Sequence, residues 1–422
     1  MRKKDILELK KRYKKEQCTF TKMCGCYVNG EKNILFNFRE TFLNLEDDEY
    51  FKYLEIAKKI LSGSIGNNIL ELNFPLNEDF VNEKQLSLTQ LKKSALKDDS
   101  LLENFYTSII ENYDYTGNFL ILLFHDAYDV ITKTKDNLKL DESDEVYEYI
   151  LCAICPVSLS KPGLRCFEEE NKIKARIRDW VVDLPTNGFI FPAFIDRSAD
   201  VNSLMYYTKN PKEHHPELME NALGCSPKQT ATIQKENFKF IIKDTMGADE
   251  EKADEIFMDI QETLNNTIEE HNAIYDDPEA EPMILTDKNI QEVLINSGIP
   301  EEITTKIEES YLENFSEEPP LAENLVDIKL IKINEQRKKE ERLEKQVQLL
   351  QEELEEAKGE IALTSDSEKD LENESSNYDV VLHVKPKKLP QIKSQIIDGQ
   401  KCIIIPINDD EQTTINGQED LI

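Results

Sequence analysis

The sequence predicts an α+β fold in which a mixed or antiparallel sheet precedes an acidic helical region. Two nearly continuous apolar runs, Asn118–Phe124 and Val146–Cys155, have the length of strands and suit strands that are buried on both faces. Other strand-like segments follow these runs, and helix-like segments gather before and after them instead of alternating with strands one by one. From about Pro211 helical periodicity takes over, and the chain closes with a short coiled coil and a small C-terminal β unit.

Apolar spacing and turn residues predict the elements before the central runs. Residues 3–16 place Ile6, Leu9 and Tyr13 on one helical face. Asn29-Gly30 is a strong hairpin signal because both residues tolerate positive φ. The predicted segments are a hairpin over Thr19–Val28 and Asn33–Phe38, a helix over Asp48–Leu61, a turn and strand within Leu61–Leu72, and helices within Leu86–Tyr113 with a cap at Asp98.

Short strands are expected after the central runs. Alternation of Ile173, Ala175 and Ile177 favours a strand over a short helix in residues 171–183. Two further strands, Gly188–Phe194 and Ser203–Tyr207, are joined by the polar connection IDRSAD.

The second half of the chain is predicted to be helical. Its helices are Gln234–Met246, Asp249–His271 and the pair Thr286–Ser297 and Pro300–Phe315, with an acidic linker at Asp276–Pro282. The last pair has the layout of a DNA-reading helix–turn–helix. We reject that role because the glutamates of its second helix would repel phosphate. Closing β structure is expected at Asp379–Val384 and Gln395–Ile407, with a turn at Asp398-Gly399.

A leucine-rich seam lies between the helical region and the closing β segments. Its apolar residues alternate by four and three over about three heptads, which is typical of a coiled coil. These oligomerisation candidates are Leu343, Val347, Leu350, Leu354, Ala357 and Ile361. The seam fits either a homodimer or an intramolecular hairpin.

The composition shifts predict six regions. They are an α+β core domain (1–210), an acidic helical domain (211–332), a coiled-coil segment (333–363), a disordered acidic linker (364–378) that contains Asp366–Asn377, a β-rich closing segment (379–407) and a flexible tail (408–422).

The overall charge restricts the function classes. The net charge of −33 argues against a whole surface built to attract phosphate or anionic lipid, although a local basic face stays compatible with it. We expect no membrane contact, because no apolar run has the length of a membrane span and no signal core follows the basic N-terminus. The eight cysteines fit reduced thiols of a cytoplasmic protein.

One polar cluster at the end of the first apolar run has the residue types of an active site. His125, Asp126 and Asp129 resemble part of a metal-dependent phosphohydrolase centre, and Asp196 and Arg197 are further candidates. Such a centre needs another histidine upstream, and no histidine precedes position 125. A histidine that is hydrogen-bonded to nearby polar groups is therefore the simpler interpretation.

Two cysteine pairs, Cys24/Cys26 and Cys152/Cys155, could together supply four zinc ligands. The Cys-x-Cys spacing is poor for a zinc knuckle, and a three-residue offset on a strand directs Cys152 and Cys155 to opposite faces. Buried, inert thiols are the simpler interpretation, and we expect no metal and no cofactor.

An internal basic segment is the best candidate for contact with nucleic acid. If its basic residues alternate along one strand, four of them share a face, close to the only tryptophan of the chain. These candidates are Lys161, Arg165, Lys172, Lys174, Arg176, Arg178 and Trp180. The basic N-terminal segment Arg2–Lys22 is a second candidate. A salt-bridged surface is the alternative for both, since Glu168–Glu170 interrupt the internal segment.

Several strings of the sequence resemble a bacterial family that is described as domain of unknown function 4317. They include CTFTKMCGCYVNGEK, NYDYTGNFLILLFHDAYDV, SDEVYEYILCAICPVSLSKPGL, GFIFPAFIDRS and IIDGQKCIIIPI. The resemblance covers nearly the whole chain, implies no activity, and leaves Ile333–Asn377 as an apparent insertion. A second resemblance, in the order of elements alone, is to bacterial nucleoid-associated proteins.

Together these patterns predict a non-enzymatic cytoplasmic protein that binds nucleic acid or a protein partner. The alternatives are a metal-dependent hydrolase at His125 and Asp126, and an interaction scaffold that works through the coiled coil.

Overall fold

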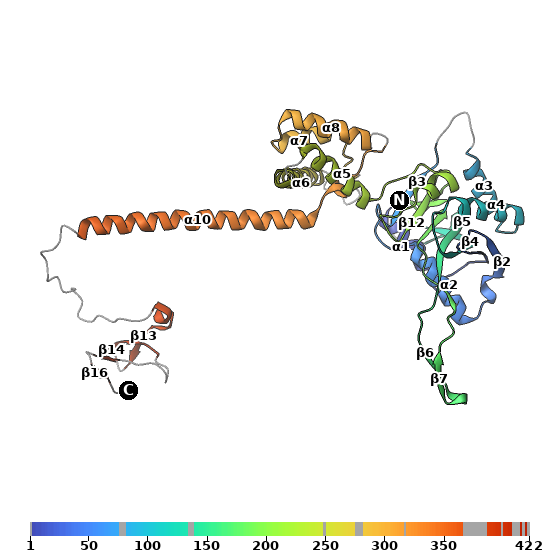
Figure 1. Cartoon of the computed structure of the whole chain (residues 1–422), viewed down its shortest axis with the longest axis horizontal. Coiled ribbons are helices and arrows are strands. Elements are labelled where there is room, and N and C mark those ends of the chain that lie inside the picture. Colours follow the sequence, from blue (N-terminus) through green and yellow to red (C-terminus); the bar gives the residue numbers. More distant parts are fainter. Residues whose placement is uncertain are drawn as a thin grey trace. The chain divides into compact units, whose positions relative to one another are not determined.

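A computed structural model describes residues 2–75, 82–133, 139–247, 250–274, 282–315, 318–365, 386–397, 400–406, 414–415 and 418–419 (Figure 1). The chain divides into two compact units, Met1–Lys338 and Lys339–Ile422. Several predicted segments lie outside the described residues, namely most of the linker at Asp276–Pro282, the linker Asp366–Asn377, the strand Asp379–Val384, the turn Asp398-Gly399 and nearly all of the tail. The predicted domain boundaries stay predictions.

A large antiparallel sheet forms the centre of the first unit and confirms the predicted α+β fold. The strands are ordered β2-β1-β4-β5-β9-β12-β3, and β8 pairs with the end of β5. Their bounds are β1 Lys22–Val28, β2 Ile34–Thr41, β3 Ile69–Asn73, β4 Asn118–Lys133, β5 Lys139–Leu159, β8 Trp180–Val182, β9 Asn187–Phe191 and β12 Ser203–Thr208. The two apolar runs of the sequence therefore form the adjacent central strands β4 and β5.

Helices cover both faces of the sheet, so the domain has three layers. Residues of α1 (Lys3–Arg12) and α2 (Asp47–Ile60) share one hydrophobic core with Leu122 and Phe124 of β4. Residues of α3 (Glu83–Lys93) and α4 (Asp99–Asn112) share the other core with Ile121 and Leu123. Successive residues of a strand point to opposite faces. An uninterrupted apolar run is thus what a strand between two helical layers requires.

The predicted end of the first central strand is wrong. The sequence suggests that His125 and Asp126 lie at the end of this strand, yet β4 continues to Lys133 and pairs with β5 beyond them. Tyr128 and Val130 keep the alternating apolar pattern going and pack into the core on the α2 face. The polar residues between them hide this alternation, because they occupy the opposite face or are hydrogen-bonded in the core.

Two small hairpins extend the sheet domain. β6 (Leu164–Phe167) pairs with β7 (Lys172–Ala175) across the 3₁₀ helix η2 (Glu168–Glu170), and the pair extends away from the large sheet (Figure 1). The strand predicted to carry the basic residues through Arg178 thus ends at Ala175, which is a correction. The connection IDRSAD forms another hairpin, β10 (Ala193–Ile195) with β11 (Ser198–Asp200), whose turn residues Asp196 and Arg197 adopt positive φ.

The helical part of the first unit has its own hydrophobic core. It contains α5 (Ala231–Met246), α6 (Glu250–Ile274), α7 (Asp287–Asn296), α8 (Glu301–Phe315) and α9 (Ala322–Leu325). The predicted helices match these elements closely. Short helices η1 (Phe42–Asn44) and η3 (Leu218–Ala222) connect elements of the sheet domain.

Helix α10 (Ile328–Ser365) begins in the first unit and continues into the second. The second unit also contains η4 (Pro386–Gln391) and the strand pairs β13 (Lys393–Ile397) with β14 (Gln400–Ile404) and β15 (Thr414–Ile415) with β16 (Gln418–Glu419). Across the described part of the chain, no helix combines the length and the apolar character that crossing a bilayer demands.

Candidate functional site

A groove lies on the α2 face of the sheet, between the β1–β2 edge, α2 and β8. It consists of two adjoining hollows of about 570 and 530 Å³, which share Glu49, Tyr53, Leu120 and Val182 in their lining. Both hollows are within the size range of ligand sites, and together they form an extended surface. We call this surface the β8 groove.

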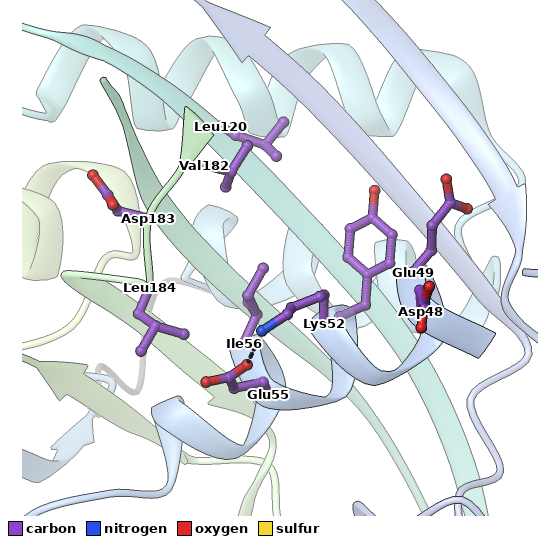
Figure 2. A pocket seen from close by; sticks show the side chains of 10 residues that line it. Asp48, Glu49, Lys52, Glu55, Ile56, Leu120, Val182, Asp183 and Leu184 are labelled. Atoms are coloured by element: carbon purple, nitrogen blue, oxygen red, sulfur yellow. Dashed lines mark hydrogen bonds and ion pairs between the residues drawn. The ribbon is translucent and has the colours of Figure 1, made fainter. Parts of the chain in front are cut away.

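The floor of the β8 groove is apolar. Leu120 and Val157 belong to the core on this face, yet both also line the groove. β8 adds Val182, which pairs directly with Val157 of β5. Figure 2 shows Leu120 and Val182 close together above α2, from which Lys52 and Ile56 rise toward the same space.

Aromatic rings form the wall of the groove on the side of β2. Tyr27 and Phe36 are cross-strand partners whose ring centroids lie 5.4 Å apart, and Phe38 follows on the same face of β2. Trp180 lines the groove from β8. The Phe36 and Trp180 side chains are 54% and 56% exposed, so large apolar surfaces face solvent here.

The rim of the groove is acidic. Among the described residues that line it, six are acidic and Lys52 alone is basic; its Nζ lies 3.0 Å from the carboxylate of Glu55 (Figure 2). The acidic residues are Glu40, Glu46, Asp48, Glu49, Glu55 and Asp183. Burial raises the pKa of the Tyr53 phenol, and the negative charges of Glu49 and Glu40 raise it further. A ligand that combines positive charge with apolar surface would match this groove.

The suspected active-site residues are not brought together. His125 faces the α3–α4 side, where its Nδ1 lies 3.3 Å from Thr21 Oγ1 and its Nε2 lies 3.1 Å from Glu148 Oε1. Asp126 points to the opposite face and accepts hydrogen bonds from Thr19 (2.6 Å) and Tyr149 (2.7 Å).

The other members of this cluster lie elsewhere. Asp129 is exposed, Asp196 pairs with Arg2 at 3.4 Å, and Arg197 pairs with Glu8 at 2.7 Å. In the part of the chain that the structure describes, no group of three histidine, cysteine or acidic residues is arranged to hold a metal ion.

The two cysteine pairs are buried in different cores. Cys24, Cys26 and Cys152 belong to the core on the α3–α4 face, whereas Cys155 belongs to the core on the α2 face. Burial raises the pKa of the Cys26 thiol to about 12 and also raises the pKa of Cys152. These side chains are therefore thiols rather than thiolates at neutral pH, and the four do not converge.

The residues of the predicted basic segment do not share one surface, because only some of them lie on the β6–β7 hairpin. On the β6–β7 hairpin, Arg165 opposes Lys174 and Phe167 opposes Lys172, so all four share one face. The cations of Arg165 and Lys174 each lie 5.4 Å from the centroid of the Phe167 ring.

The remaining candidates of this segment have different surroundings. Lys161 is exposed, and Arg176 lies 3.9 Å from the carboxylate of Asp179. Arg178 donates to the carbonyl oxygens of Ser160 and Leu159, and Trp180 belongs to the β8 groove instead of the hairpin.

The seam candidates of α10 lie on one long helix. The side chains of Leu343, Val347, Leu350 and Leu354 are 60%, 51%, 61% and 55% exposed. Ala357 and Ile361 are helical, but their side chains lie outside the described part of the structure.

Comparison with known protein families identifies the family of this chain. The family model described as "Domain of unknown function (DUF4317)" matches residues 1–418. The chain belongs to this family. Neither the curated proteins nor the solved structures provide a match to this DUF4317 chain.

Sequence reasoning missed the groove of this DUF4317 protein. Its described lining residues come from β1, from β2 through α2, and from β4, β5 and β8, and only the tertiary structure brings Phe36, Tyr53 and Trp180 together. Two local signals were present, namely alternating Phe36 and Phe38 on an edge strand and the acidic residues at the start of α2. Both signals also occur in ordinary surfaces, so neither could identify a site alone.

Proposed function

We propose that this protein is a non-enzymatic binding protein whose β8 groove holds an extended, positively charged segment of a protein partner. One observation carries the proposal: an apolar and aromatic floor is enclosed by six acidic residues and one paired lysine. An extended peptide that alternates Lys or Arg with apolar side chains satisfies both features.

Each part of the groove would contribute a separate interaction. Apolar side chains of the partner would cover the exposed surfaces of Val182, Trp180 and Phe36, at about 25 cal/mol for each Å² removed from water. Lysine or arginine stems would pack on Tyr53 and Trp180 while their charges approach the acidic rim. The net charge of −33 would also steer a cationic partner toward the protein.

The free edge of the sheet supports a polypeptide over a small organic cation. β2 is an outer strand, and no strand among the described residues pairs with its outer side. Its apolar residues Ile34, Leu35 and Phe36 are exposed. An exposed apolar edge strand is a template for pairing with another chain, and this edge borders the groove.

Trp180 provides a direct test because it is the only tryptophan and it lines the groove. Peptides of ten residues that alternate Lys with Leu would be titrated into the full chain while its fluorescence is followed. We expect a saturable spectral change that weakens with salt, and no change with peptides in which Glu replaces Lys.

Charge-reversed variants give the matched control. Glu49→Lys is expected to weaken binding by about tenfold or more, since it reverses a charge that both hollows share. Glu111→Lys makes the same change at an exposed position of α4, which packs on the opposite face of the sheet, and should leave binding intact. Equal effects of the two variants would contradict a site in the groove.

Contact with nucleic acid through the β6–β7 hairpin is a second candidate. It is favoured by one observation: three cations, Arg165, Lys172 and Lys174, share a face with the Phe167 ring. Such a face could contact phosphates and stack on a base. The nearby acids, including Glu170 in an ion pair with Lys174, oppose this role. A nucleoid-associated role in the cytoplasm would depend on this contact.

This second candidate is tested by fluorescence polarisation with labelled single- and double-stranded oligonucleotides at low salt. Binding should be lost in Lys172→Glu and in Phe167→Ala but kept in Glu49→Lys, which alters only the groove. If the oligonucleotides do not bind, or if the hairpin variants bind normally, nucleic acid is not the ligand of this face.

A further inference from the structure

We infer that α10 forms a parallel two-stranded coiled coil with a second copy of this chain. Leu343, Val347, Leu350 and Leu354 follow the four-three-four spacing of a heptad repeat, and every one of them is more than half exposed. A single helix that exposes four large apolar side chains along one stripe leaves unfavourable apolar surface in water. The inference is independent of the proposed peptide groove, which lies in the other unit.

The positions of the residue types indicate two strands. With Leu343 and Leu350 at d, the residues at a are Val347 and Leu354. A β-branched residue at a combined with leucine at d favours parallel dimers over larger assemblies. In the sequence the repeat continues through Ala357 at d and Ile361 at a, which again places a β-branched residue at a.

Charges beside the seam match a second copy of the same helix. In a parallel coiled coil, a residue at g faces the residue at e in the next heptad of the other helix. This rule places Lys339 opposite Glu344 of the second copy and Gln346 opposite Gln351 of the second copy. All four side chains are exposed on α10 and therefore accessible for these pairs. The Lys339–Glu344 ion pair would form twice, because the dimer is symmetric.

An antiparallel pair would use different contacts. If Val347 faced Leu350 of an antiparallel neighbour, residues at e would face one another, and Glu344 would lie opposite Gln351 instead of Lys339. We choose the parallel arrangement because it places Val347 against Val347 and leucine against leucine in separate layers. The two arrangements make different predictions for a charge swap.

The mass of the full chain in solution is the first measurement. Sedimentation equilibrium should give twice the 48.9 kDa of one chain. Leu350→Asp should raise the dissociation constant of the dimer by about a hundredfold or more, because it buries a charge in the seam. Gln348→Asp introduces the same side chain outside the seam and should leave the dimer intact. A monomeric wild-type chain, or equal effects of the two variants, would overturn the inference.

A charge swap then tests the orientation. Lys339→Glu and Glu344→Lys should each weaken the dimer, and the double variant should restore it, because the pair is then formed in reverse. In the antiparallel arrangement these two positions are not partners, so the second substitution could not compensate for the first. Absence of rescue would overturn the parallel arrangement, even if the wild-type chain is a dimer. Circular dichroism of each variant controls for loss of helix.

Discussion

The ring of Phe38 occupies the space that a side chain at Gly25 would need. A Cβ at Gly25 would lie 2.2 Å from Cε1 and Cζ of that ring, which is far inside van der Waals contact. The two residues are cross-strand partners on β1 and β2. The lack of a side chain at Gly25 therefore leaves space for the Phe38 ring, which forms part of the wall of the β8 groove.

This relationship makes Gly25→Ala a test of the groove wall. We expect a loss of about 1–3 kcal/mol in the free energy of unfolding, because either the Phe38 ring must move away or the two strands must shift. Urea denaturation followed by circular dichroism measures the loss. Gly163→Ala is the control, since a Cβ at Gly163 would meet no atom within 4 Å. Equal stability of the two variants would show that Phe38 has room to move.

A second prediction concerns Asp126, which the sequence presents as a catalytic candidate and the structure places in a core. Asp126→Ala removes the acceptor of two hydroxyl groups, those of Thr19 and Tyr149, so we expect a loss of about 1–3 kcal/mol in unfolding free energy. Asp129→Ala changes an exposed residue of the same strand and should cost less than about 0.5 kcal/mol. Comparable unfolding midpoints for the two would argue against a structural role for Asp126.

A third prediction concerns pH and His214. Burial lowers the pKa of His214, against the opposing effect of Glu217, and His215 adds to the lowering. The unfolded chain therefore binds a proton at a higher pH than the folded chain does. The stability contributed by neutral His214 is complete above the unfolded pKa of about 6.5 and declines as the pH falls through and below it. The free energy of unfolding, measured from pH 8 to 5, should fall less steeply in His214→Gln than in the wild type. If the free energy of unfolding depends on pH equally in both proteins, His214 does not contribute to the pH dependence.

A fourth prediction concerns Arg178 and separates a structural arginine from a nucleic-acid contact. Its guanidinium donates to the carbonyl oxygens of Ser160 (2.7 Å) and Leu159, and Leu159 pairs with Trp180. Arg178→Ala should therefore loosen β8, which would raise acrylamide quenching of Trp180 and cost about 1 kcal/mol or less. Lys172→Ala, on the separate β6–β7 hairpin, should leave the quenching unchanged. If Arg178→Ala weakens nucleic-acid binding without changing the quenching, the arginine is a ligand contact instead.

The fold was largely predictable because its signals are local. Uninterrupted apolar runs predicted the central strands, Asn29-Gly30 predicted a hairpin, and Asp98 does cap α4 by accepting from the backbone amides of Ser100 and Leu101. The errors arose at polar residues that the sequence suggests are exposed but that the tertiary structure buries. Asp126 was predicted at the end of a strand as a catalytic candidate, but it is buried and accepts a hydrogen bond from Thr19, 107 residues away.

The candidate site was less predictable, because it depends on which segments meet. Trp180 was assigned to the basic segment by proximity in sequence, yet β8 turns back onto β5 and places it beside Phe36 and Tyr53. The heptad seam of α10 is the opposite case, since a repeat along one helix is visible in the sequence without any tertiary contact.

The sheet order also governs when this domain can fold. Thr21 on the approach to β1 meets His125 of β4, 104 residues further along, and Asn68 beside β3 meets the carbonyl of Thr208, 140 residues further along. Such distant pairings must close large loops before they gain contacts, which makes folding slow. During synthesis, β3 cannot acquire its neighbour β12 until Thr208 has left the ribosome. The nascent chain up to that point therefore exposes apolar strands, and its dependence on chaperones should be greatest just before that strand emerges.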